Sequence, residues 1–163
     1  MMADGSGRGL GMGLRIGAVM VGLCCGLVAS VALAAEPFAD ERIALALTPP
    51  EKAYVLGQMR LFVASIQTIA DGLAHGDAAQ AAEAAAARGA ARNAHDPDFP
   101  ASLNEKLPAD WKQFGGSLRK GFDGLAQSLA QGEPQSQSLA RLADLMRNCV
   151  SCHASYRVVE SRE

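Results

Sequence analysis

The sequence has few of the residues that several common functions require. Only 5% of its 163 residues are aromatic, histidine occurs three times, and the formal net charge is −2. Proteins that bind nucleic acid present a concentrated basic surface, so this charge balance argues against nucleic acid as a partner. A chain of this length is expected to form one domain with its own hydrophobic core.

Cysteine is also scarce, and two of the four cysteines lie in an N-terminal segment that has the features of a targeting signal. Arg8 and Arg15 supply positive charge ahead of an almost unbroken apolar run over residues 16–33. A charged start followed by such a run is typical of a secretory signal peptide, which is removed from the mature protein. The sequence therefore predicts export, and we expect the product in the periplasm.

Small residues mark the end of this signal. Ala32 and Ala34 form an A-x-A-like site just before a polar stretch, so we expect cleavage after Ala34 or Ala35. This divides the chain into a signal peptide over 1–35 and a single domain over 36–163. The apolar run is slightly longer than a typical signal core, which leaves an uncleaved membrane anchor as the alternative. Stable membrane insertion is not expected.

Removal of the signal leaves only two cysteines, and both belong to the run Cys-Val-Ser-Cys-His at 149–153. This spacing is the pattern of c-type haem attachment. On a helix, residues three apart share a face, so Cys149 and Cys152 can each bond to one haem vinyl group. His153 then lies over the same porphyrin and can bind the iron from the proximal side. The motif predicts one covalently bound haem c per chain.

Other interpretations of the motif have less support. A disulfide between the two cysteines is sterically possible, and a thioredoxin-like redox pair needs a βαβ context that this sequence lacks. A structural zinc ion needs four ligands, and only His75 and His95 could supply the fourth.

The remainder of the mature chain predicts four helices and no convincing strand. The first begins at the capping box Thr48-Pro-Pro-Glu51 and ends at Gly76. The other three are expected over about 77–92, 109–129 and 138–158, with the haem motif on the last. These helices fit an all-α fold, an antiparallel four-helix bundle with the haem between helices.

Apolar residues alternate by three and four on the first and last helices, as on a heptad seam. The seam of the first helix comprises Val55, Met59, Phe62, Ile66, Ile69 and Leu73. That of the last comprises Leu139, Leu142, Met146, Cys149, His153 and Tyr156.

The third helix is interrupted by Gly115, Gly116, Gly121 and Gly124. Each glycine lowers helix stability by about 1 kcal/mol relative to alanine, which indicates close approach of a neighbour or of a flat haem. A break into two shorter helices at Gly115-Gly116 is the alternative.

A C-terminal haem motif followed by Ala-Ser-Tyr-Arg, behind a signal peptide and antiparallel helices, resembles the class II cytochromes c. That group contains cytochrome c′ and its low-spin relatives, and the resemblance covers about Thr48 to Val158. It implies that the sixth ligand or distal pocket lies on the first helix, at the position of Met59. The Arg-Gln pair often seen upstream of that position is replaced here by Val-Leu-Gly. Relatives are often dimers, so the resemblance also allows a homodimer.

The predicted function depends on what occupies the sixth coordination position of the haem iron. With Met59 bound, the protein is a one-electron carrier between periplasmic redox proteins. With that position open, it is a five-coordinate NO- or CO-binding protein like cytochrome c′. An enzyme such as a peroxidase would need a distal His or Glu, which the first-helix seam lacks, so no catalytic residue is assigned. Four arginines are expected to be solvated, with one or two as candidates for the haem propionates: Arg60, Arg119, Arg147 and Arg157.

We predict that N-terminal sequencing of the exported protein finds Ala35 or Glu36 as the first residue. The reason is that the small side chains at Ala32 and Ala34 fit the cleavage site. A protein that begins at Met1 and stays in the membrane fraction would show that the apolar run is an anchor.

Overall fold

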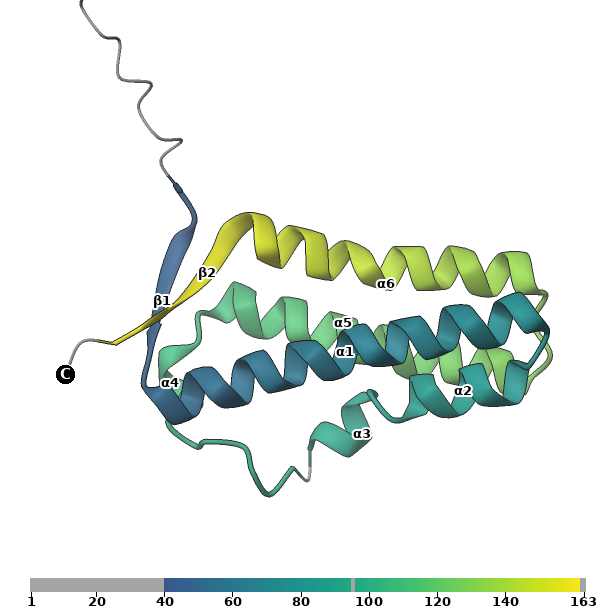
Figure 1. Cartoon of the computed structure of the whole chain (residues 1–163), viewed down its shortest axis with the longest axis horizontal. Helices are drawn as coiled ribbons and strands as arrows, with labels where there is room; N and C mark the ends of the chain where they lie inside the picture. The colour runs from purple at the N-terminus through teal and green to yellow at the C-terminus, as the bar shows by residue number, and fades with distance from the viewer. Residues whose placement is uncertain (1–39, 95, 162–163) are drawn as a thin grey trace, which may run out of the picture. The chain divides into compact units, whose positions relative to one another are not determined.

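The computed structural model describes residues 40–94 and 96–161, which are mostly helical, as the sequence predicts (Figure 1). The expected signal peptide over 1–35 and His95 lie outside the described residues. The elements in order are β1 (Ile43–Leu47), α1 (Pro49–His75), α2 (Ala78–Ala86), α3 (Ala90–Asn93), α4 (Leu103–Lys106), α5 (Ala109–Ala130), α6 (Gln135–Ser155) and β2 (Tyr156–Glu160). They belong to one unit of the chain that starts at Ala39.

The ends of α1 lie where the sequence predicts them. Its first residue is Pro49, whose fixed φ suits the first turn of a helix. The backbone N–H of Thr48 donates to Oε2 of Glu51 over 2.8 Å, which satisfies a donor at the helix start. At the other end Gly76 has φ 76°, a left-handed conformation that closes the helix.

Glu51 also ties the start of α1 to α4. Its carboxylate accepts hydrogen bonds from Lys106 Nζ at 2.8 Å and from Ser102 Oγ at 2.6 Å. These bonds, with the one from Thr48, lower the pKa of Glu51 to about 2. A buried carboxylate with this many donors stays ionised and holds the two segments together.

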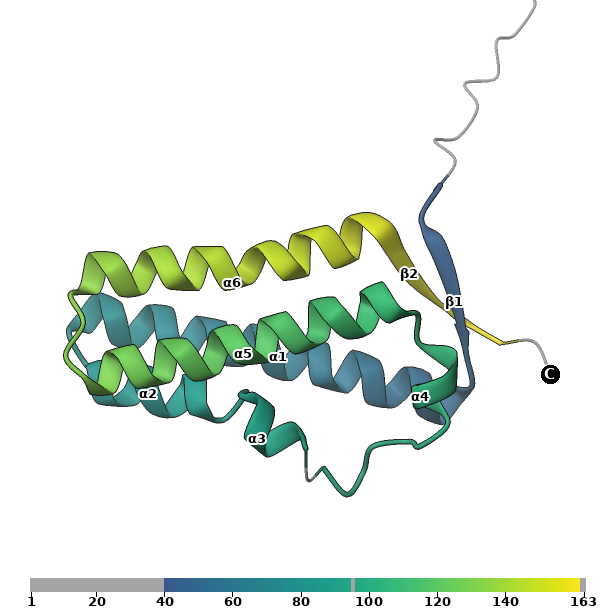
Figure 2. The same ribbon diagram turned by 180° about the vertical axis from the view of Figure 1, so that it is seen from behind.

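The long helices pack in a closed order, because α1 contacts α2, α2 contacts α5, α5 contacts α6, and α6 contacts α1. Figure 2, seen from behind, shows α6 on one side of α1 and α5, with α2 and α3 on the other. The main hydrophobic cluster joins Ile69, Leu73, Ala81, Ala85, Leu118, Phe122, Leu125, Leu129, Leu142 and Leu145. A second cluster of Leu47, Val55 and Leu103 lies near the start of α1. No helix among the described residues is both long and apolar enough to cross a membrane.

The expected second helix over 77–92 is shorter than predicted. Helix α2 ends at Ala86, and a turn separates it from α3. The carboxylate of Asp123 on α5 accepts the backbone N–H of Ala90 at 2.9 Å and lies against Gly89, where a side chain would collide with it. This contact from a distant helix breaks the alanine-rich run, so sequence periodicity could not reveal it.

The expectation of no strands was wrong, and so was the end of the last helix at Val158. Helix α6 ends at Ser155, and the next five residues pair with β1 as a parallel two-stranded sheet in which Ile43 faces Tyr156. Parallel strands far apart in sequence give no local signal beyond a short β-branched run. The pairing brings both ends of the described chain together beside the haem motif.

The buried face of α6 is rotated slightly from the predicted seam. Leu139 and Met146 are 44% and 37% exposed, while Ser138 and Leu145 are buried. Ser138 tolerates burial because its hydroxyl proton has two acceptors in reach, the carboxylate of Glu133 at 3.3 Å and the carbonyl of Pro134 at 3.4 Å.

Two glycines of α5, which is continuous through Gly115-Gly116, offer a matched test of helix packing. A Cβ at Gly121 would lie 2.8 Å from the Cβ of Leu145, whereas one at Gly124 would meet nothing within 4 Å. We predict that Gly124→Ala stabilises the protein by up to about 1 kcal/mol, because alanine is the better helix former. We predict that Gly121→Ala destabilises it by about 1–3 kcal/mol, because α5 and α6 must separate. Urea unfolding of both variants measures the difference, and equal stabilities would contradict the close approach.

Candidate functional site

A cavity of about 630 Å³ lies between α1, α5 and α6, and α4 closes part of one side. Its volume falls in the range of roughly 300–1,000 Å³ typical of cofactor and ligand sites. The lining from α1 comprises Tyr54, Val55, Gln58, Met59, Phe62, Val63 and Ile66. That from α5 includes Trp111, Phe114, Gly115, Gly116, Leu118 and Arg119, and that from α6 comprises Met146, Asn148, Cys149, Val150, Cys152 and His153. Val63 and Val150 are 67% and 69% exposed, so the rim reaches the surface.

The cavity interrupts the hydrophobic seam of α1. Val55 before it and Ile69 after it are buried, while the seam residues between them, Met59, Phe62 and Ile66, are only partly buried. All three line the cavity, although Phe62 and Ile66 also pack against the edge of the main hydrophobic cluster. An apolar stripe that is buried at both ends and uncovered in the middle indicates a missing apolar partner.

All four predicted haem-site residues line this one cavity. Cys149, Cys152 and His153 come from the last turns of α6, and Met59 comes from the middle of α1. Cys149 also packs against the main hydrophobic cluster, and Met59 packs against the second one. The fold therefore brings together residues that lie far apart in the sequence.

The two thiols are in environments that disfavour ionisation. Both cysteines are free and partly buried. Burial raises the pKa of Cys149, and burial together with the neighbouring Cys149 raises that of Cys152 to about 11. Redox and nucleophilic cysteines have lowered pKa values, so these thiols are poor candidates for that chemistry.

Open space also surrounds two glycines of α5. A Cβ at Gly115 or at Gly116 would meet no atom within 4 Å, and both residues line the cavity. From the sequence, the glycines of this helix were expected to allow close approach of a neighbour or of a flat haem. The first explanation holds for some of them only. It holds for Gly121, which faces Leu145, whereas Gly115 and Gly116 face empty volume.

A polar network closes the cavity on the side away from α6. Asp96 accepts hydrogen bonds from the Tyr54 hydroxyl at 2.7 Å and from Gln58 Nε2 at 3.3 Å. Burial and this carboxylate raise the pKa of Tyr54 to about 12. The guanidinium of Arg119 lies over the ring of Phe62, 4.9 Å from its centroid. Arg119 was expected to be solvated, but its side chain is partly buried.

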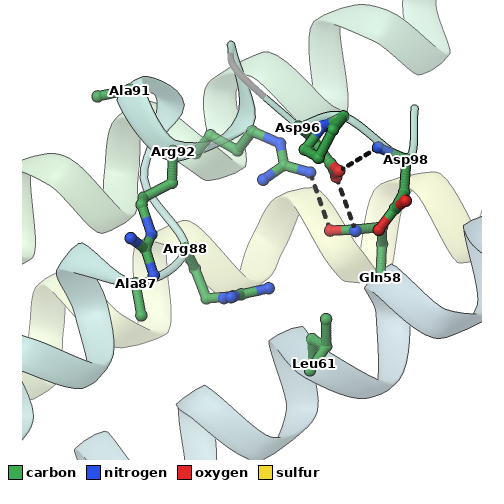
Figure 3. A pocket seen from close by; sticks show the side chains of 10 residues that line it. Gln58, Leu61, Ala87, Arg88, Ala91, Arg92, Asp96 and Asp98 are labelled. Atoms are coloured by element: carbon green, nitrogen blue, oxygen red, sulfur yellow. Dashed lines mark hydrogen bonds between the residues drawn. The ribbon is translucent and has the colours of Figure 1, made fainter.

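Behind this wall is a second cavity of about 500 Å³ between α1, α5, the turn before α3 and the loop after it. Figure 3 shows Arg88, Arg92, Asp96 and Asp98 around it, with Gln58 bonded to Asp96. Gln58 and Arg119 line both cavities.

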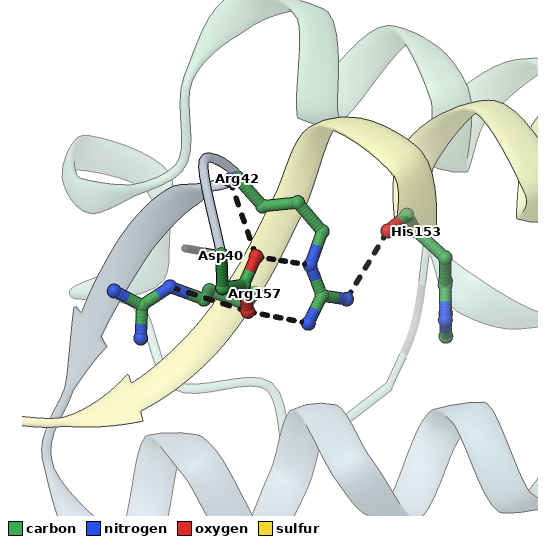
Figure 4. Close-up of polar contacts among 4 residues, drawn as sticks. All are labelled: Asp40, Arg42, His153 and Arg157. Carbon is green, nitrogen blue, oxygen red and sulfur yellow. Dashed lines mark hydrogen bonds and ion pairs between the residues drawn. The ribbon is translucent and has the colours of Figure 1, made fainter. Parts of the chain in front are cut away.

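The Cys-Val-Ser-Cys-His segment is held from outside by the residues just before β1. Arg42 donates to the backbone carbonyl of His153 over 3.2 Å and bonds twice to Asp40 at 2.8 Å, while Arg157 lies 3.7 Å from the same carboxylate (Figure 4). Arg42 is the main cause that lowers the pKa of Asp40 to about 2. The imidazole of His153 points away from this cluster in Figure 4. No sequence pattern indicates these contacts, because they depend on the pairing of β1 with β2.

The other histidine that the structure describes, His75, does not line the cavity. His75 ends α1, as expected of a residue at a helix C-terminus, with Nδ1 2.9 Å from the carbonyl of Asp71. Within residues 40–94 and 96–161, no three His, Cys, Asp or Glu side chains gather as a metal site.

Comparison with protein-family models, with curated proteins and with solved structures finds no match to this chain.

We predict that the thiols of the haem-free folded protein react slowly with iodoacetamide at pH 8. A pKa near 11 at Cys152 leaves about a hundredfold fewer thiolates than an unperturbed cysteine has. The rate should rise steeply with pH and become ordinary after unfolding in urea, which serves as the control. A fast reaction that is independent of pH above 7 would indicate an activated thiol.

Proposed function

We propose that this protein is a periplasmic c-type cytochrome of the class II type that carries single electrons between redox proteins. One haem c is bonded to Cys149 and Cys152, and the iron is held by His153 and Met59. The observation that carries the proposal is the meeting of these four residues at a single cavity.

Features of the cavity support a haem as its occupant. The volume, the mostly apolar lining and the partly buried seam of α1 suit a large flat apolar ring. The empty space beside Gly115 and Gly116 allows such a ring to approach the backbone of α5. Both thiols are free, as thioether formation requires.

The haem iron supplies a one-electron couple whose potential depends on its axial ligands. The chain positions those ligands on two different helices. Arg42 fixes the peptide of His153 through its carbonyl, and the packing of α1 sets the position of Met59. A thioether sulfur raises the potential and leaves no position for another ligand.

The surrounding side chains keep water from the iron. Phe62, Ile66 and Leu118 line the cavity with hydrocarbon. An iron in apolar surroundings changes charge with little rearrangement of solvent, which suits electron transfer. No residue is assigned to move a proton or to act on a substrate.

In this proposal α1, α2, α5 and α6 form the antiparallel four-helix bundle of the class II cytochromes. The closed order of their contacts supports it. Export and periplasmic partners are inferred from the N-terminal sequence alone.

The first prediction concerns attachment. Purified exported protein should keep its haem in acid–acetone and show the mass of the chain plus one haem. The double variant Cys149→Ala/Cys152→Ala should lose this mass, because no thioether can form. Variants of Cys24 and Cys25, which lie in the expected signal, are the control and should keep it. Haem that extracts freely from the wild type would disprove covalent attachment.

The second concerns the sixth ligand. The oxidised wild type should show the weak near-red band of sulfur-to-iron charge transfer. Met59→Ala should lose this band completely and bind CO when reduced, because the thioether is gone. Met146→Ala removes a methionine from the same cavity and should leave the band unchanged. A high-spin wild type that binds CO or NO readily would favour the five-coordinate gas-binding function.

A further inference from the structure

Arg119 is a partly buried cation in the wall between the two cavities, and it forms no ion pair with the described residues. Among the described residues its one hydrogen bond is to Gln58 Oε1, at 3.5 Å, and no carboxylate forms an ion pair with it. Burial is the main cause that lowers the pKa of Arg119, and Arg88 adds to it, while the charges of Tyr54 and Asp96 offset only part of this effect. Leaving a buried charge unpaired is costly, and such a group ordinarily has a partner.

The position of Arg119 leaves its donors available. The face of the guanidinium lies on Phe62, and this stacking uses none of its N–H groups. The planar group has five donors in a fork that fits a carboxylate. Because Arg119 lines the main cavity, these donors can meet a ligand there.

The structure of haem c determines which of its groups would lie beside Gln58 and Arg119. Its two carboxylate side chains lie on the porphyrin edge opposite the two positions that form thioethers. Cys149 and Cys152 approach from α6, while Gln58 and Arg119 lie between the main cavity and the second one. In Figures 1 and 2, α6 and α3 lie on opposite sides of α1 and α5. A porphyrin bonded to α6 therefore directs its carboxylates toward Arg119.

We propose that Arg119, with the amide of Gln58, binds a propionate of the haem and thereby anchors the porphyrin edge opposite the thioethers. This inference rests on the proposed haem. Arg88 strengthens it, because its Nε is buried without a hydrogen-bond partner and its charge adds to the positive potential at the same wall. Asp96 attracts Arg119 electrostatically but forms neither an ion pair nor a hydrogen bond with it, and its carboxylate accepts bonds from Tyr54 and Gln58.

The test compares holoproteins that carry Arg119→Gln, Arg119→Lys or, as the control, Lys120→Gln. Lys120 is the next residue on α5 and is exposed. The first readout is the propionate bending band in the resonance Raman spectrum, whose frequency rises with hydrogen bonding to the carboxylate. Arg119→Gln should lower this frequency, Arg119→Lys should lower it less, and Lys120→Gln should leave it unchanged.

The second readout is the reduction potential. Arg119→Gln should lower the ratio of reduced to oxidised protein at a fixed solution potential by roughly tenfold, which is about 59 mV for one electron. Arg119→Lys keeps the charge and should stay close to the wild type. If the Arg119→Gln protein does not accumulate, the Raman band of Arg119→Lys tests the inference instead. Lysine keeps the charge but lacks the two parallel N–H donors of the guanidinium, so the band frequency should still fall.

An unchanged band in the Arg119 variants would overturn the inference while leaving covalent haem, measured by mass, intact. A wild type without the haem mass would instead refute the proposed function. Added acetate at constant ionic strength should not shift the wild-type band. A shift would mean that Arg119 takes a free carboxylate, and this would also overturn the assignment.

Discussion

The main constraint on the fold is that the apolar faces of α1, α5 and α6 do not fully bury one another. Around the cavity these helices are too far apart for their side chains to cover one another fully. The main hydrophobic cluster and the smaller cluster near the start of α1 lie on either side of this gap. Met59, Phe62 and Ile66 remain partly exposed there. Full burial of one such side chain contributes about 1.5–3 kcal/mol. An apolar occupant would therefore complete the core as well as provide the chemistry.

The structure holds the end of α6 from two sides. On the inner side Cys149 packs against the main cluster, and on the outer side Arg42 binds the carbonyl of His153. The buried Tyr156 follows, with its ring edge-on to Trp111 at 5.5 Å. A ligand that is to hold a metal must keep its orientation, and supporting contacts of this kind provide it. The two strands also contribute buried side chains to the core, namely Leu45, Leu47 and Tyr156.

The polar residues of the site are segregated from the apolar ones. Tyr54, Gln58 and Asp96 satisfy one another by hydrogen bonds at one wall, and this leaves the centre of the cavity free of unpaired acceptors. Arg119 is the exception, a desolvated cation beside an otherwise complete network. This arrangement suits a ligand that is apolar in its middle and anionic at one edge, which is the character of a haem.

The helical class, both ends of α1 and the position of the Cys-Val-Ser-Cys-His motif could be predicted from the sequence alone. These follow from local physics, namely capping at Thr48 and Glu51, the left-handed glycine at 76, and the fixed spacing of Cys149 and Cys152. The tertiary structure decided that Met59 shares a cavity with that motif, that Asp123 breaks the alanine-rich run, and that the chain ends pair as strands. It also buries part of Arg119. Such features depend on which distant segments come into contact, and a pattern along one segment carries no information about its partners.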